Sequence, residues 1–176
     1  MDFRPAAAQD FPAIQPFYWD VIDGIHRNNP HHKNLGWEKG VYPSDCFLSD
    51  SIRASQLYTL RSGGTLCACM ILNSAYNEGY NGCPWRIACT PNEVLIPHAL
   101  AVHPSLQGKG IGVTVVEHIL RLAKDQQKKA VRLDVLAACE AARHLYIRCG
   151  FQFVAEKTMF YEDTGWTEYQ MFELGL

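Results

Sequence analysis

Apolar residues recur at two spacings along this chain, and each spacing indicates a type of element. Near the N-terminus they recur every three or four positions, as on one face of a helix; the positions are Ile14, Phe17, Tyr18, Val21, Ile22 and Ile25. Asp10 is the expected N-cap of this helix, with Pro12 in its first turn. Pro16 is expected to kink the helix or delay its start. A second helix is expected to begin at Ser44.

The remaining pattern alternates strands with helices. Two β-prone runs, 57–61 and 65–73, flank Ser62-Gly63-Gly64 and predict a hairpin. Further strands are expected at 94–103, 131–135, 151–160 and 167–174, and helices at 110–126 and 140–149. Gly150 closes the last helix at its C′ position. This order predicts a mixed α/β fold.

Composition limits the class of protein. The 176 residues are 48% hydrophobic and 19% charged, which is typical of a globular chain, and we expect residues 1–176 to form a single domain. The net charge of −2 argues against a nucleic-acid or membrane partner. Residues 1–4 contain no apolar leader, so a soluble cytoplasmic protein is expected. The oligomeric state stays undetermined, with a homodimer as one possibility.

The cysteines indicate a reducing compartment. There are seven, an odd number, and no two have the C-x-x-C spacing of zinc or redox sites. Cys67 and Cys69 share one face of a predicted strand, where packing is favoured over metal binding. No metal is expected.

A glycine-rich turn lies between a predicted strand and a predicted helix. Its sequence is Gln107-Gly108-Lys109-Gly110-Ile111-Gly112. Such a turn leaves N–H groups exposed at a helix N-terminus, where the helix dipole also favours an anion. Two nucleotide motifs fail: G-x-G-x-x-G needs glycine at Val113 or Val115, and a P-loop needs glycine at His103. The turn therefore predicts a pyrophosphate site, with an ordinary strand-to-helix turn as the alternative.

The pattern Q-x-x-G-x-G, directly after residues 100–104, resembles the acetyl-CoA signature of the GNAT superfamily of N-acetyltransferases. The resemblance extends to Leu133-Asp134-Val135, Ala141-Ala142-x-x-Leu145-Tyr146 and Gly150-Phe151, in the family's order. It implies a GNAT-like mixed sheet of about six to seven strands flanked by about four helices, with a splayed parallel strand pair holding acetyl-CoA. Cofactor contacts are implied for Ala101, Val102, Gln107, Gly108, Lys109, Gly110, Ile111, Gly112, Val113, Cys139, Ala142 and Tyr146.

One position departs from the family pattern. Cys139 stands where the family commonly has Asn at the start of the last helix. A thiol is a poor N-cap, so the helix entry or a cofactor contact must be made differently, with Glu140 as one candidate.

The resemblance also implies catalytic roles. Tyr146 would donate a proton to the leaving sulfur, although its spacing alone fits core packing. The N–H of Leu100 would stabilise the oxyanion. His98 shares a strand face with Leu100 and Val102, and the string at 98–103 resembles the arylalkylamine acetyltransferases. It is the candidate base, with a structural histidine as the alternative. Pro97 indicates an irregularity in this strand.

The acceptor is predicted only as a primary amine, of a small molecule or of a protein. Aromatic residues in two loops suit a cationic amine with an apolar body, although packing is the alternative; they are Trp37, Tyr42, Tyr80 and Trp85, with Tyr76, Glu38 and Glu78 beside them. The competing function is a catalytically inactive acyl-CoA sensor on the same fold. A nucleotide-binding regulator is disfavoured, because the glycine-rich turn has the spacing of neither the G-x-G-x-x-G motif nor the P-loop.

Overall fold

The computed structural model describes residues 1–28 and 36–176, so His31 and His32 of the first long loop lie outside the described residues. Its strands are β1 (Asp2–Pro5), β2 (Leu57–Ser62), β3 (Thr65–Asn73), β4 (Val94–Val102), β5 (Ala130–Leu136), β6 (Gln152–Tyr161) and β7 (Gly165–Gly175). Its α-helices are α1 (Phe11–Asn28), α2 (Asp45–Arg53), α3 (Ile111–Asp125) and α4 (Glu140–Arg148). Short 3-10 turns are η1 (Ala8–Asp10), η2 (Glu78–Tyr80), η3 (Pro91–Glu93) and η4 (Pro104–Leu106).

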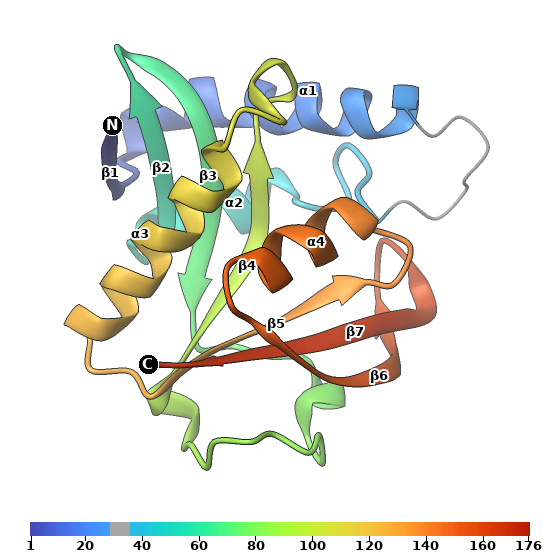
Figure 1. The fold of residues 1–176 in the computed structure, drawn as a ribbon. Coiled ribbons are helices and arrows are strands. Elements are labelled where there is room, and N and C mark those ends of the chain that lie inside the picture. Colours follow the sequence, from blue (N-terminus) through green and yellow to red (C-terminus); the bar gives the residue numbers. More distant parts are fainter. Residues whose placement is uncertain (29–35) are drawn as a thin grey trace. The chain divides into compact units, whose positions relative to one another are not determined.

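The strands form a seven-stranded sheet in the order β1-β2-β3-β4-β5-β7-β6 (Figure 1). Strands β4 and β5 are parallel. The pairs β1/β2, β2/β3, β5/β7 and β6/β7 are antiparallel. The predicted mixed α/β fold is therefore confirmed, with strand and helix numbers within the expected range.

The chain forms two compact units that interleave in sequence. The N-terminal unit contains residues 1–72 and 98–115, and the C-terminal unit contains residues 73–97 and 116–176. Strand β4 contributes to both, because the division falls between Pro97 and His98. Each unit is described separately below.

The N-terminal unit is built on the predicted hairpin. Strands β2 and β3 pair from Leu57↔Ile71 to Ser62↔Thr65, and β1 adds to the outer edge of β2. The apolar face of α1 lies in the core, where Ile14, Phe17, Tyr18, Val21 and Ile22 are all buried. The predicted start of the second helix is also confirmed, because Ser44 Oγ accepts the N–H of Phe47 at 3.2 Å.

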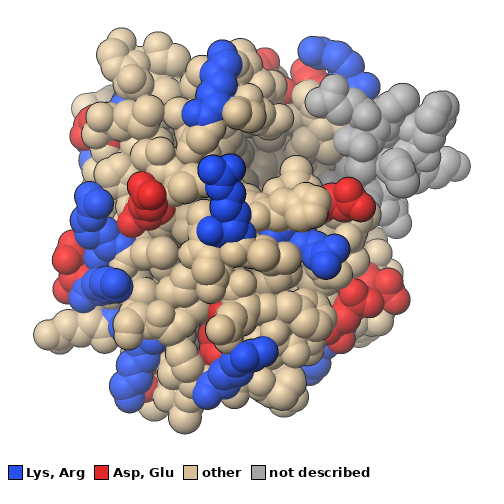
Figure 2. Space-filling model, in the orientation of Figure 1, with Lys and Arg blue, Asp and Glu red and all other residues tan. Residues whose placement is uncertain are grey.

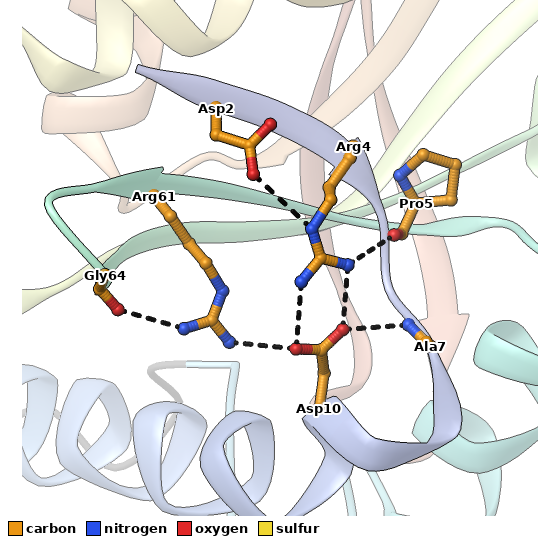
Figure 3. A network of polar contacts seen from close by, with 7 residues as sticks. All are labelled: Asp2, Arg4, Pro5, Ala7, Asp10, Arg61 and Gly64. Carbon is orange, nitrogen blue, oxygen red and sulfur yellow. Dashed lines mark hydrogen bonds and ion pairs between the residues drawn. The ribbon is translucent and has the colours of Figure 1, made fainter.

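Two expectations about the start of α1 are wrong. Asp10 lies in η1 and does not cap α1; its carboxylate accepts the N–H of Ala7 at 2.9 Å and pairs with Arg4 and Arg61 (Figure 3). Two guanidinium groups thus draw this carboxylate away from the helix end. The helix begins at Phe11 and includes Pro16, so the delayed start is wrong, and the alternative expectation, a kink at Pro16, stays a prediction.

The C-terminal unit surrounds the antiparallel strands β5, β7 and β6. Leu133 of β5 lies opposite Phe172 of β7, and both are buried. Glu173 of β7, 2% exposed, pairs with Arg132 Nε of β5 at 2.9 Å. Gly150 follows α4 with a φ of 92°, which confirms its expected C′ position.

Charged side chains of both signs lie on the face of the molecule in Figure 2. On the face in Figure 2, basic and acidic side chains are interspersed, in keeping with 16 basic and 18 acidic residues in the whole chain. None of the helices in the described part of the chain has the length and apolar character needed to cross a membrane. Within residues 1–28 and 36–176, no group of three or more His, Cys, Asp or Glu side chains is placed to hold a metal ion. None of the cysteines forms a disulfide.

Candidate active site

The glycine-rich turn opens α3 in the N-terminal unit. The side chain of Gln107 donates from Nε2 to the carbonyl of Val102 at 3.2 Å, which ties the turn back to the end of β4. Gly108 and Gly110 have φ values of 73° and 82°, a conformation that a side chain disfavours. These two glycines explain why the chain reverses sharply between strand and helix.

Successive amide groups of this turn have no partner in the protein. Among the described residues, no acceptor is found for the N–H groups of Gly108, Lys109, Gly110, Ile111, Gly112 and Val113, whereas Thr114 N–H bonds to Gly110 O at 3.2 Å. Residues 107–110 are exposed. A row of unsatisfied donors at a helix N-terminus fits a diphosphate, which is the ligand group predicted from the sequence.

Strand β4 is distorted next to this turn. Ala99 has a φ of 48°, in the left-handed region, which confirms the irregularity indicated by Pro97. Buried Ala99 and Ala101 alternate with half-buried His98, Leu100 and Val102, whereas the shared face of the last three side chains stays a prediction. The pairing of β4 with β5 within the C-terminal unit is at Val94↔Ala130 and Leu95↔Val131.

Tyr146 lies in α4 of the C-terminal unit. Its ring is buried and packs edge-on against Phe151, with 5.4 Å between centroids. Its hydroxyl makes no hydrogen bond to any of the described residues, and it is not among their fully buried unpaired atoms. Burial, and then the charges of Cys139 and Asp134, raise the pKa of Tyr146, so the phenol keeps its proton at neutral pH.

Asp134 is a candidate functional residue that the sequence reasoning missed. It is half-buried in β5, where Oδ1 accepts the Tyr80 hydroxyl at 2.6 Å and Oδ2 accepts the Tyr161 hydroxyl at 3.2 Å. No described lysine or arginine forms an ion pair with it. Burial raises the pKa of Asp134, and the two hydroxyls oppose that rise. From the sequence, this aspartate was identified only as part of the strand motif Leu133-Asp134-Val135, without a functional role.

A second carboxylate in the C-terminal unit, that of Asp163, also has a raised pKa. Partial burial raises the pKa of Asp163, which lies between β6 and β7, to about 6, and the charge of Asp134 contributes to the rise. Perturbed carboxylates gather at functional sites more often than elsewhere.

The loop that carries Tyr80 is docked onto β6. Asn77 accepts the N–H of Gly79 at 2.8 Å and donates to Phe160 O at 2.9 Å. A Cβ added to Gly79 would lie 2.6 Å from Cγ of buried Met159 and closer still to its Sδ. Only glycine lets η2 approach β6 this closely, and that approach places Tyr80 against Asp134.

The loop aromatics predicted to bind the acceptor are divided between the units. In the C-terminal unit, Tyr80 is 5% exposed and stacks on Tyr76, while Trp85 donates to Tyr80 O at 3.1 Å. In the N-terminal unit, Trp37 and Tyr42 contact each other edge-on and pack against the core. Each group has a packing role, so acceptor binding by these residues stays a prediction.

The start of α4 matches the expectation for Cys139. The thiol makes no capping bond, and the entry is made by the backbone, with Cys139 N–H donating to Leu136 O at 2.7 Å. Glu140 is exposed in the first turn and its side chain contacts none of the described polar groups. Ala142 is half-buried one turn before Tyr146.

A family model described as the acetyltransferase (GNAT) family matches residues 18–151. This match includes the glycine-rich turn, the distorted strand and Tyr146. The chain belongs to the GNAT family. The N-alpha-acetyltransferase RimI of Mycobacterium tuberculosis is 33% identical over 111 residues, which are 63% of this chain. The chain spans 61% of that relative's length.

Solved GNAT structures share the fold at low identity. An acetyltransferase of the GNAT family from Streptococcus agalactiae superposes with a TM-score of 0.78 at 14% identity, covering 99% of this chain and 95% of its own. A Salmonella typhimurium protein solved with its cofactor acetyl-CoA gives 0.70 at 18%, covering 100% and 94%. The ribosomal-protein-S18-alanine N-acetyltransferase of Escherichia coli gives 0.67 at 15%, covering 99% and 92%.

Proposed function

We propose that this GNAT chain is an acetyl-CoA-dependent N-acetyltransferase whose acceptor is a primary amine. The observation that carries the proposal is the row of unpartnered N–H groups between Gly108 and Val113, at the start of α3. Six N–H donors, three in the exposed turn and three in the first turn of α3, have no acceptor among the described residues and suit a diphosphate. Acetyl-CoA is the cofactor used by the family, and when bound it supplies the activated acetyl thioester.

We propose that the acceptor is the α-amine of a peptide or protein. The names of the Mycobacterium tuberculosis and Escherichia coli relatives support this class, since both denote N-terminal or alanine acetyltransferases. An α-amine has an ordinary pKa of about 7.7–8.0, against about 10.4 for a lysine side chain. A larger fraction is therefore neutral and nucleophilic at pH 7, so a weak base suffices.

Residues of this chain are proposed to bind the cofactor arm, to stabilise the oxyanion and to protonate the leaving sulfur. Main-chain groups of Ala101 and Val102 would hold the pantetheine arm, and Leu100 N–H would stabilise negative charge on a carbonyl oxygen. The Tyr146 hydroxyl, protonated at neutral pH and without a hydrogen-bond partner among the described residues, would supply the proton that a leaving sulfur requires.

Two groups compete for the role of proton acceptor. His98 is the proposal from the sequence, and it is half-buried in β4, two positions before Leu100. Asp134 is the alternative from the geometry. Its carboxylate has a raised pKa and no cationic partner among the described residues, and its charge acts on Tyr146.

Cofactor binding tests the function first. Acetyl-CoA at 100 times its Kd should stabilise the folded protein by about 2.7 kcal/mol, measured as a rise in Tm. Gly110→Glu should lose that rise, because it introduces a side chain and a negative charge into the turn. Gly64→Glu is the matched control: its φ is 84°, close to the 82° of Gly110, and a Cβ at either position meets nothing within 4 Å. Equal stabilisation of both variants by acetyl-CoA would refute the proposed diphosphate site.

Turnover then separates an enzyme from an acyl-CoA sensor. Thiol release should be seen with peptides that have a free α-amine and be absent with the same peptides blocked at that amine. Tyr146→Phe should lower turnover by roughly 10²–10⁴-fold and keep cofactor binding. Binding without release of thiol from any amine would instead identify a sensor.

The proton acceptor is identified by a pair of variants, His98→Gln and Asp134→Asn. The one that removes the acceptor should lower turnover by roughly 10²–10⁴-fold and flatten the rise of activity with pH. The other should keep the parent's profile. If both keep it, neither residue accepts the proton.

A further inference from the structure

The strained residue in β4 is held by a side chain from α1. Three non-glycine residues in the described part of the chain have positive φ: Ser55, Ala99 and Gln127. Ser55 and Gln127 each follow a helix, where their N–H groups bond to the last turn. Ala99 alone lies within a strand. A left-handed alanine costs about 1–2 kcal/mol, so another contact must compensate.

Tyr18 provides that contact. Its hydroxyl donates to the carbonyl of Ala99 at 2.9 Å, although the two residues are 81 positions apart in sequence. Tyr18 is 1% exposed, and burial raises its pKa well above the usual value, so the hydroxyl stays a neutral donor. The ring is fixed by edge-on contacts with Phe17 and Trp37, at 5.6 and 5.9 Å between centroids.

Planarity of the peptide bond transmits this anchor to the next residue. The carbonyl of Ala99 and the N–H of Leu100 belong to one peptide group, and in a trans peptide they point in opposite directions. Because Tyr18 fixes the carbonyl toward the core, the N–H of Leu100 is directed away from the core. A hydrogen bond to the carbonyl also polarises the amide and strengthens its N–H as a donor.

We propose that Tyr18 is a positioning residue that orients and polarises the Leu100 N–H for the reaction. The proposal rests on the proposed function, in which this N–H stabilises negative charge on a carbonyl oxygen. Its catalytic effect therefore passes through the peptide group between Ala99 and Leu100. Tyr18 itself contacts no reacting atom.

Tyr18→Phe removes one hydroxyl and keeps the buried ring. Removal of a whole oxyanion donor lowers turnover by about 10²–10³-fold, so loss of its orientation should lower kcat by about tenfold with KM for acetyl-CoA unchanged. A second readout needs no cofactor: without the hydrogen bond to its carbonyl the amide is less polarised, so the Leu100 N–H in the free protein should exchange hydrogen more slowly in Tyr18→Phe. The control is Tyr58→Phe, which removes a hydroxyl from a ring in the same unit that stacks on Phe3, and should change neither quantity.

Rescue separates positioning from general stability. Ala99→Gly removes the strain of the left-handed conformation, so Tyr18→Phe combined with Ala99→Gly should recover kcat toward that of Ala99→Gly alone. Loss of activity without rescue, and with unchanged exchange at Leu100, would overturn the proposal and leave Tyr18 a core residue. Unchanged kcat and exchange in Tyr18→Phe would overturn it as well. If the parent transfers acetyl to no amine, the proposed function fails, whereas the exchange measurement still decides whether Tyr18 orients the amide.

Discussion

Each unit contains a carboxylate held by two side-chain donors, and the donors differ in charge. In the N-terminal unit, Asp10 is bound by the guanidinium groups of Arg4 and Arg61 (Figure 3). In the C-terminal unit, Asp134 is bound by the hydroxyls of Tyr80 and Tyr161. Hydrogen bonding and the charge of Arg4 lower the pKa of Asp10, whereas burial raises the pKa of Asp134.

This difference in donor charge suits Asp10 to stabilising the fold and Asp134 to proton transfer. A carboxylate between two cations is fixed as an anion, so its proton affinity is of no use near neutral pH. Neutral donors hold Asp134 in place and leave it able to take up a proton. The partner's charge, and not burial alone, decides which role a carboxylate can have.

The largest expected effect tests whether the role of a buried carboxylate depends on the unit that contains it or on the charge of its partner. Glu173 lies in the C-terminal unit with Asp134, but it pairs with Arg132, whose side chain is 10% exposed. Arg132→Met should destabilise the fold by about 3–5 kcal/mol in urea unfolding, because it leaves a buried charge unpaired. It also removes the bond from Nη2 to Ile87 O and the contact of the guanidinium with Trp85. The double variant Arg132→Met with Glu173→Leu should recover most of the lost unfolding free energy. If it does not, the unpaired charge of Glu173 is not the cause of the destabilisation.

Asp10→Asn should destabilise the protein by about 2 kcal/mol at pH 7 in urea unfolding. The folded pKa of Asp10 lies below its ordinary value of 3.8, so its contribution is present above that value and is lost as pH falls through the folded pKa. The difference between parent and variant should therefore shrink as the pH falls below 3.8. A difference that stays constant with pH would contradict an ionic origin.

Asp134→Asn should have the opposite sign and stabilise the protein at pH 7 by about 1 kcal/mol. The folded pKa of Asp134 is raised, so the folded state is favoured below the unfolded value of 3.8 and loses stability as pH rises through the folded pKa. Asparagine does not ionise and avoids that loss. The parent and the variant should be equally stable at about pH 3. Destabilisation at pH 7 would show that the carboxylate is held as firmly as Asp10.

The smallest effect is on the pKa of Asp134 itself. The Tyr80 hydroxyl lowers that pKa, so Tyr80→Phe should raise it further, as measured by carboxyl ¹³C NMR titration. Gly79→Ala should act in the same direction, because the added methyl meets Met159 and moves η2 away from β6. Tyr76→Phe is the control, since its ring stacks on Tyr80 and its hydroxyl does not bond to Asp134. An unchanged pKa in Tyr80→Phe would mean that the hydroxyl does not tune the carboxylate.

Most elements could be predicted from the sequence, because they depend on residues close together in the chain. The hairpin from the glycines at 63 and 64, the cap at Ser44 and the C′ glycine at 150 all follow from local conformational preferences. The glycine-rich turn belongs to this class as well: its unused N–H groups result from the glycine spacing and the start of a helix. Asp10 was assigned wrongly for a related reason, since capping is local, whereas its partner Arg61 lies 51 positions away in the sequence.

Only the tertiary structure decided which polar groups meet. Asp134 receives hydroxyls from 54 and 27 positions away, and Ala99 receives one from 81 positions away. Pro97 indicated an irregular strand, but an alanine gives no sign that it will adopt a positive φ, because that conformation is unfavourable for it alone. Hydrophobic periodicity specifies the face that each element buries. The contacts of single side chains depend on how the elements pack, which no local pattern in the sequence determines.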